Sequence, residues 1–114
     1  PGIFTKEQEA GWKKVVEAVH RKECKISLQL WHLGRMSHEV FGTHPYLKAQ
    51  NRPLGSVSSS NVTPPGYCRN WKGEKVAYTC PRALEEDELL NRIPHDYRQA
   101  AEAAKRCGFD FVEI

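Results

Sequence analysis

The segment 28–35, Leu-Gln-Leu-Trp-His-Leu-Gly-Arg, holds the side chains best suited to bind a small molecule. The Gln29 amide offers two donors and an acceptor, which suits a ligand edge that mixes both, such as a nucleobase or a flavin pyrimidine ring. The alternative is a hydrogen bond from Gln29 to neighbouring backbone, because buried polar groups are normally paired. Spacing alone leaves both interpretations open.

Strand alternation decides which side chains share a face with Gln29. In an extended strand over residues 25–31, successive side chains point to opposite sides. One side then carries Ile26, Leu28 and Leu30, and the other carries Ser27, Gln29 and Trp31. Gly34 ends this strand and helix-like segments flank it, which favours a βα architecture. In that architecture, sites are built at the carboxyl ends of the strands.

The ionisable residues that follow this strand form no recognisable catalytic or metal-binding set. His32 stands alone beside Gly34-Arg35, and a single histidine there is typical of a hydrogen-bonded loop. His38 and His44 have no third ligand in zinc-like spacing. We therefore assign no catalytic residue and no metal site within the chain.

Composition excludes several classes of partner. The 114 residues have room for one small domain, and 17 basic residues are mixed with 14 acidic ones, without a stripe that would bind nucleic acid. No apolar run approaches the roughly 18 residues of a membrane span, and no signal-peptide pattern opens the chain. We expect no nucleic-acid or membrane partner and a cytoplasmic location. The first residue, Pro1, suggests an excised or processed piece.

Four cysteines are spread far apart, at positions 24, 68, 80 and 107. They could form two disulfides, but they show no Cys-x-x-Cys pairing and no secretory signal precedes them. Reduced thiols are therefore expected.

The first helix is predicted over residues 6–22. Thr5 and Gln8 have the spacing of a capping box, in which each side chain satisfies a backbone amide at the helix start. An apolar stripe then recurs at helical spacing and is expected to be buried: Trp12, Val15, Val16 and Val19.

A long excursion follows at residues 36–80. Proline, glycine and serine punctuate it, so regular helix is improbable, while its apolar side chains argue against a disordered linker. A loop of this length in a compact domain is usually functional when it is ordered. Short strands at 55–59 and 75–79 could pair within it.

A second helical stretch is predicted over residues 86–106. Pro94 lacks an amide donor, so we expect a short helix at 86–92 and a new one starting near Pro94. Gly108 is placed to end the helix, and residues 109–114 are predicted to form a second strand. The order helix, strand, excursion, helix, strand indicates a parallel α/β fold.

Several segments resemble the Old Yellow Enzyme family of flavin-dependent ene-reductases, in register and along nearly the whole chain. They are Pro1–Gln8, Ala18-Val19-His20, Gln29–Arg35, Thr63-Pro64-Pro65, Pro81–Leu84, Asp96–Ala101 and Gly108-Phe109-Asp110 with Val112-Glu113-Ile114.

The resemblance implies an α/β fold, a partial TIM (β/α)8 barrel with about two of its eight βα units and the long excursion. It also implies FMN at the barrel mouth and hydride transfer from NADPH or NADH to an activated alkene such as an enone. Gln29 matches the family's flavin-binding glutamine and Trp31 an aromatic wall of the substrate pocket. For Trp31, simple packing in the barrel interior is the alternative. Arg35 could approach the flavin phosphate or pin its loop, and the oligomeric state stays open.

Three departures from the family pattern stand out. Glu23-Cys24 replaces a glycine near the first helix end, and Phe111 stands where many members have glycine. Glu113 shares a face with Phe111 and is expected to point inward, where a carboxylate needs a cation or several donors. The family's substrate-anchoring pair, a histidine followed three residues later by histidine or asparagine, would follow Ile114 directly, so it lies outside these residues.

The competing function is a non-catalytic, truncated remnant or interaction module that binds no flavin. A third possibility, the iron–sulfur dienoyl-CoA reductase branch of the superfamily, requires a cysteine cluster that this chain lacks. The isolated 114 residues are expected to be inactive and to hold no stoichiometric FMN.

Overall fold

The computed structural model describes residues 2–43 and 55–114, which form two compact units. The first unit combines Pro1–Trp31 with Asp87–Ile114, and the second is His32–Glu86, which contains the predicted excursion.

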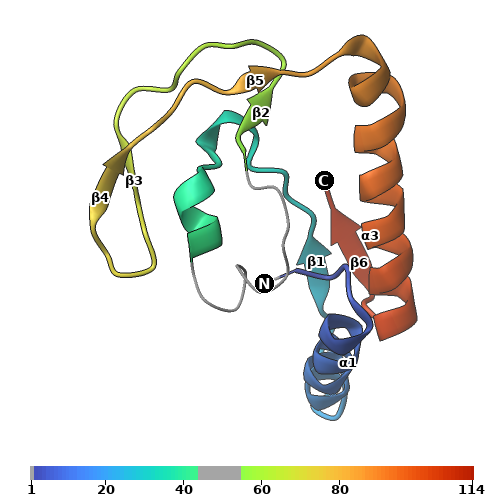
Figure 1. Cartoon of the computed structure of the whole chain (residues 1–114). Helices are drawn as coiled ribbons and strands as arrows, with labels where there is room; N and C mark the ends of the chain where they lie inside the picture. Colours follow the sequence, from blue (N-terminus) through green and yellow to red (C-terminus); the bar gives the residue numbers. More distant parts are fainter. Residues whose placement is uncertain (1, 44–54) are drawn as a thin grey trace. The chain divides into compact units, whose positions relative to one another are not determined.

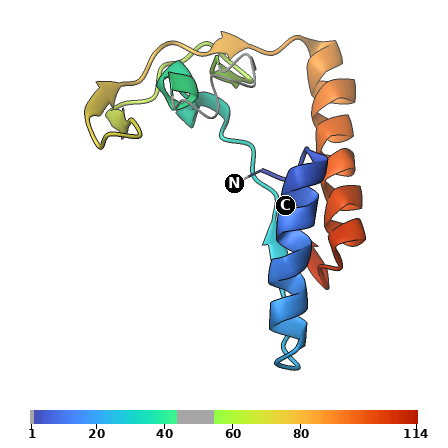
Figure 2. The same ribbon diagram turned by 60° about the horizontal axis from the view of Figure 1, so that its bottom comes forward.

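The first unit is built on a parallel pair of strands. Strand β1 (Ser27–Gln29) pairs with β6 (Phe111–Glu113), and Ser27 lies opposite Phe111 in register (Figure 1). The helices α1 (Lys6–His20) and α3 (Ile93–Cys107) pack beside each other next to these strands (Figure 2). The parallel order inferred from the sequence is therefore present in this unit.

The core of this unit lies between the helices and one face of the sheet. Its buried members are Ile3, Ala103, Ala104 and Cys107, and Trp12, Leu28, Ala100 and Phe109 pack against them. The Trp12 indole meets Phe109 edge-on at 5.7 Å between ring centroids and donates its Nε1–H to the Gly2 carbonyl at 3.0 Å. The helices therefore cover the face of β1 that carries Leu28.

Helix α1 begins as its sequence predicts but buries less of its apolar stripe. Thr5 accepts a hydrogen bond from the Gln8 amide, and the Gln8 side chain accepts one from the Thr5 amide, which confirms the capping box. Val16 is buried, whereas Val15 is 45% exposed, so the prediction that Val15 is buried is wrong. Consecutive helical residues point about 100° apart, and α1 turns its Val16 side toward the core.

The residues after α1 turn through a left-handed conformation. Helix α1 ends at His20, and the Glu23 amide donates to the His20 carbonyl at 2.9 Å. Glu23 has φ of 56°, the only positive φ among the described non-glycine residues. A Cβ atom is strained in that conformation, which glycine adopts at little cost.

Replacing Glu23 with glycine is expected to stabilise the chain by about 1 kcal/mol, because it removes the left-handed Cβ penalty. Glu23→Ala keeps the Cβ atom and serves as the matched control, with no such gain expected. The measurement is the thermal midpoint followed by circular dichroism. Equal midpoints for the glycine and alanine variants would contradict the strain argument.

The second helical stretch changes type just before Pro94. A π-helical turn, η3 (Glu88–Arg92), runs directly into α3, and Pro94 sits in the first turn of α3. The predicted start of a new helix near Pro94 is therefore present, although no gap separates it from the preceding turn. A π-turn widens the backbone, which accommodates the proline ring and its missing amide donor. Gly108 ends α3 at φ of 89°, as expected.

A two-pronged ion pair joins α1 to α3. The Arg106 guanidinium donates from Nε to Glu9 Oε2 at 3.1 Å and from Nη2 to Glu9 Oε1 at 2.9 Å. Lys6 adds a third contact at 3.3 Å. These donors, Arg106 foremost, lower the pKa of Glu9 from 4.5 to about 2.

Acid is therefore expected to destabilise the chain through Glu9. The contribution of Glu9 is complete above its unfolded pKa of 4.5 and disappears as the pH falls toward its folded pKa of about 2. Glu9→Gln should flatten the pH dependence of the unfolding midpoint in this window. Glu17→Gln on the same helix is the control and should leave that pH dependence unchanged. Identical pH profiles for the two variants would contradict the assignment.

Asp110 holds together the starts of β1 and β6. Its carboxylate accepts hydrogen bonds from Lys25 Nζ at 2.8 Å, from the His20 ring at 2.8 Å and from the Ile26 amide at 3.0 Å. Its own amide donates to the Ile26 carbonyl at 3.0 Å. These donors, Lys25 first, hold the pKa of Asp110 well below its ordinary range. The register of the sheet is thus fixed at the end opposite Gln29.

The second unit contains two small sheets. Strand β2 (Val57–Ser58) pairs in parallel with β5 (Arg82–Ala83), and β3 (Tyr67–Arg69) pairs antiparallel with β4 (Lys75–Ala77). The short 3-10 helices η1 (Gly34–Met36) and η2 (Glu39–Thr43) precede them. The predicted pairing of 55–59 with 75–79 is wrong, because each segment finds a different partner strand.

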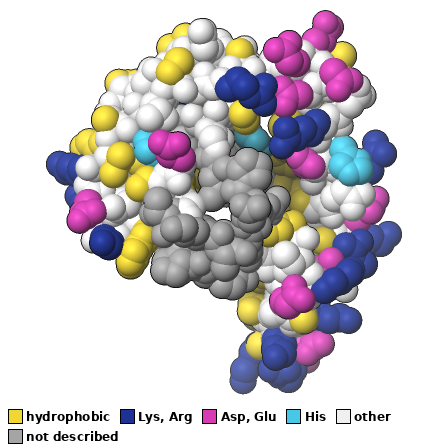
Figure 3. All heavy atoms as spheres, viewed as in Figure 1, with side chains coloured by type: hydrophobic (Ala, Val, Ile, Leu, Met, Phe, Trp, Pro, Cys, Tyr) yellow, Lys and Arg dark blue, Asp and Glu magenta, His cyan; other side chains and the backbone are white. Residues whose placement is uncertain are grey.

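The charged surface is mixed in sign. Figure 3 shows Lys and Arg side chains interrupted by Asp and Glu side chains along the helical unit. In the described ranges 2–43 and 55–114, no helix combines the length and the apolar character that crossing a bilayer requires.

Candidate functional site

Gln29 lies on the sheet face that the helices leave open. Leu28 packs into the core beneath α3, so the alternation of β1 turns Gln29 to the opposite side. The Gln29 side chain is exposed, and among the described residues its amide has no hydrogen-bond partner. The alternative, that Gln29 forms a hydrogen bond with neighbouring backbone, therefore has no support in the described part of the chain.

Trp31 follows two residues later and is 77% exposed. Residue 30, between them, is buried at 8% exposure, which fits the same alternation along the chain. The predicted cofactor-binding amide and the predicted substrate-binding indole thus come from one short segment at the carboxyl end of β1. That end is where parallel α/β folds build their sites.

Strand β6 contributes two further side chains to this open face. Phe111 is 63% exposed and lies opposite Ser27. Glu113 lies opposite Gln29, and the Ser27 hydroxyl donates to Glu113 Oε1 at 2.8 Å. The partner of Glu113 is thus a neighbouring hydroxyl, which the sequence did not reveal. Ser27 and Glu113 lie on the same face of the sheet, but the sequence predicts their contact only when the strand register is known.

The open face fits the pyrimidine part of a flavin in its donor chemistry. A flavin pyrimidine edge presents an N–H flanked by carbonyl oxygens, and a carboxamide can accept from the one while donating to the other. Gln29 is an exposed carboxamide without a hydrogen-bond partner in residues 2–43 and 55–114. No described residue is assigned to the flavin phosphate.

Arg35 belongs to the second unit and is already engaged. Its guanidinium donates to the Val62 carbonyl at 2.9 Å and to the Ser60 hydroxyl at 3.0 Å. These bonds tie the turn after β1 to the segment that follows β2. Of the two roles considered for Arg35, pinning the loop has support in the structure.

Two histidines of the second unit, His32 and His38, are held by hydrogen bonds. The His32 Nδ1 accepts from the Gly34 amide at 3.1 Å. His38 is buried; its Nδ1 accepts from the Val40 amide at 3.0 Å, so its Nε2 must carry the proton donated to the Ala77 carbonyl at 3.1 Å. His44 lies outside the described residues. Within the described ranges, no three potential ligands gather to hold a metal ion.

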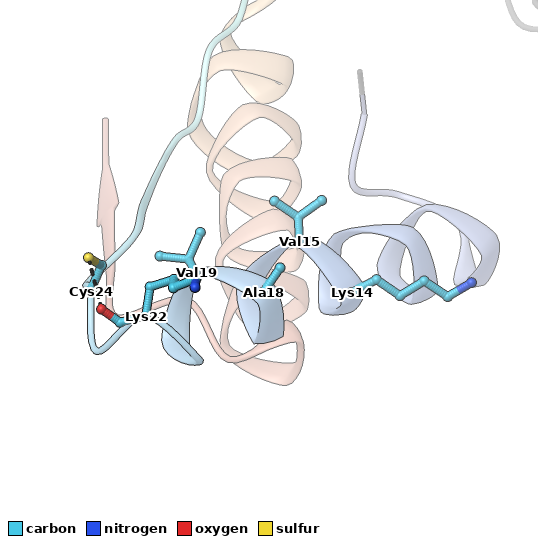
Figure 4. Close-up of a pocket in the computed structure, with 6 residues that line it drawn as sticks. All are labelled: Lys14, Val15, Ala18, Val19, Lys22 and Cys24. Atoms are coloured by element: carbon cyan, nitrogen blue, oxygen red, sulfur yellow. Dashed lines mark hydrogen bonds between the residues drawn. The ribbon is translucent and has the colours of Figure 1, made fainter.

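An apolar groove runs along the outer side of α1. It is lined by Lys14, Val15, Ala18, Val19, Lys22 and Cys24 (Figure 4). The Cys24 thiol donates to the Lys22 carbonyl at 3.3 Å. None of the residues predicted for cofactor or substrate binding lines this groove.

Comparison with known proteins decides the family. The sequence model of the NADH:flavin oxidoreductase / NADH oxidase family matches residues 1–114. The chain belongs to this family. The resemblance to the Old Yellow Enzyme group found in the sequence is thereby confirmed.

Plant reductases are among the similar sequences. Putative 12-oxophytodienoate reductase 6 of Oryza sativa subsp. japonica is 40% identical over 116 residues, covering all of this chain and 26% of the relative. A putative 12-oxophytodienoate reductase-like protein 2A of Arabidopsis thaliana is 36% identical, and the match covers 37% of its length. The chain thus spans between about a quarter and two fifths of these two relatives' length.

Solved structures agree with this family assignment. Morphinone reductase in complex with tetrahydroNAD matches 98% of the chain at 46% identity, with a TM-score of 0.78 over 30% of that protein. The old yellow enzyme homologue from Zymomonas mobilis matches 98% of the chain at 33% identity, with a TM-score of 0.82 over 28%. The mixed α/β fold of this chain is therefore similar to a part of the TIM-barrel old yellow enzymes.

Proposed function

We propose that the chain is the flavin-orienting part of an FMN-dependent NAD(P)H oxidoreductase that reduces the activated C=C bond of α,β-unsaturated carbonyl compounds. The main support is the parallel β1–β6 pair. Helices cover one face of this pair, and the other face presents the Gln29 amide, which has no partner among the residues that the structure describes. In this proposal β1 and β6 are two of the eight strands of a TIM barrel, and the open face is its interior.

In this proposal Gln29 binds the cofactor and Trp31 binds the substrate. The Gln29 amide holds the pyrimidine edge of FMN, and the Trp31 indole forms an apolar wall against the alkene and excludes water. Bound FMN supplies the hydride chemistry, with NADPH or NADH as reductant. Support for a nicotinamide reductant comes from the similar morphinone reductase, which was solved in complex with tetrahydroNAD.

The groove on α1 supports the same arrangement. Val15 is 45% exposed there, in a helix that otherwise packs its apolar side on the core. In a complete barrel, each helix has a helix neighbour on both sides. A preceding barrel helix would cover this groove.

The test requires a complete barrel. We define it as the full-length protein that carries residues 1–114, or as morphinone reductase with its matching segment replaced by residues 1–114. The complete barrel is expected to purify with about one FMN per chain, seen by flavin absorbance, and to oxidise NAD(P)H when an enone is added. The unsubstituted morphinone reductase is the control for the graft.

The isolated 114-residue chain is expected to retain no stoichiometric FMN. Its site face leaves Trp31 and Phe111 exposed at 77% and 63%, so the described residues do not enclose these two side chains. The measurement is the flavin content after dialysis against free FMN. One FMN per isolated chain would contradict this expectation.

The rival function, a remnant or interaction module without flavin, makes a different prediction for the complete barrel. It expects a folded protein without bound FMN and without enone-dependent oxidation of NAD(P)H. Circular dichroism of the same sample distinguishes this outcome from misfolding of the graft.

A further inference from the structure

We propose that Glu113 is a positioning residue for Gln29, and that it sets which end of the Gln29 amide faces the flavin. This inference rests on the proposed function, because it concerns the amide assigned to FMN. Glu113 itself does not touch the flavin in this proposal.

Strand register places the two side chains together. Glu113 on β6 lies directly opposite Gln29 on β1, and residues opposite each other in a parallel pair point to the same face. The hydrogen bond from Ser27 to Glu113, at 2.8 Å, shows that the Glu113 side chain spans the gap between the two strands on that face. Ser27 and Gln29 are two residues apart on β1, so their side chains share the face that carries Glu113.

The carboxylate has an oxygen left for Gln29. Ser27 occupies Oε1 of Glu113, and among the described residues no further side-chain partner engages this carboxylate. The Gln29 amide is likewise unpaired. An ionised carboxylate only accepts hydrogen bonds, so it can pair with the NH2 end of Gln29 and not with the carbonyl end.

This restriction removes an ambiguity that a lone glutamine would have. The two ends of a carboxamide are almost equal in shape, and the terminal torsion of glutamine has broad, roughly two-fold preferences. When one N–H pairs with Glu113 in the flavin complex, the amide presents its carbonyl oxygen and its second N–H to the ligand. That pair matches a flavin N–H beside a carbonyl oxygen, in one orientation only.

The test is a double-mutant cycle on the FMN dissociation constant of the complete barrel, measured by flavin fluorescence. Glu113→Ala is expected to weaken FMN binding about tenfold in the presence of Gln29, in line with the loss of one charge-assisted hydrogen bond. In a Gln29→Ala background the same change should have little further effect. Glu113→Gln, which keeps an acceptor oxygen but adds a competing NH2 group, should lie between the wild type and Glu113→Ala.

Ser27→Ala is the gentler variant if Glu113→Ala does not fold. It leaves the carboxylate in place but frees it from the neighbouring hydroxyl, and we expect FMN binding to weaken by about threefold, again only when Gln29 is present. The thermal midpoint of the flavin-free protein is recorded for every variant, because a merely structural role would change that midpoint without coupling to Gln29.

Three outcomes separate the claims. Tenfold weakening that vanishes in the Gln29→Ala background supports the positioning role. Equal weakening in both backgrounds, or none in either, overturns it while leaving the proposed function intact. A wild-type complete barrel that folds without binding FMN overturns the proposed function and this inference with it.

Discussion

Replacing Gln29 with Ala in the complete barrel is expected to weaken FMN binding by about tenfold to a hundredfold. The amide lies at the carboxyl end of β1, is exposed, and has no partner within the described part of the chain. Its loss would leave a flavin N–H and a flavin carbonyl unpaired at the same time. Each unmet hydrogen bond costs about 1 kcal/mol or more in a site that excludes water.

Fluorescence titration of the flavin-free complete barrel measures this effect. Trp31→Ala is the matched control, because Trp31 shares the open face but is assigned to the substrate. It should leave the FMN dissociation constant nearly unchanged and alter the relative kcat/KM values for enones of different size. An unchanged FMN affinity in Gln29→Ala would show that the amide has another role.

Ala104→Leu is expected to destabilise the chain by about 1–3 kcal/mol through overpacking. Ala104 is fully buried in the core of the first unit, where Ala103 and Cys107 are also buried. Small residues on this face of α3 let the helix approach the sheet closely, so a larger side chain must displace the helix or adopt a strained rotamer.

The measurement is the free energy of unfolding of the chain in urea. Ala10→Leu provides the control, because Ala10 is an exposed alanine of α1 and receives the same additional atoms. The control should change stability by about 0.5 kcal/mol or less. If both substitutions were equally tolerated, the close packing of α3 would not be a determinant of stability.

Local features of the fold were predictable because they depend on residues a few positions apart. The capping box joins Thr5 to Gln8, and the left-handed end of α3 needs only Gly108. Alternation along β1 likewise predicts that Gln29 lies on the face opposite Leu28. The assignment of Gln29 to FMN and of Trp31 to the substrate stays a prediction.

Non-local features were predicted less well. The exposure of Val15 depends on where α3 packs against α1, and the partners of β2 and β4 depend on how the excursion folds back. Glu23 adopts a left-handed conformation that its residue type does not predict. The Ser27–Glu113 bond joins residues 86 positions apart, so only the register of the finished sheet reveals it.

The separation of β1 from β6 in the chain also bears on biosynthesis. Ser27 leaves the ribosome 86 residues before Glu113. Strand β1 therefore cannot pair with β6 until the ribosome has synthesised the whole excursion. Closing so long a loop carries a large entropic cost before any pairing energy is recovered. At translation rates of about 5–20 residues per second, the waiting time is several seconds. A nascent chain stalled within the excursion would present that unpaired edge to chaperones.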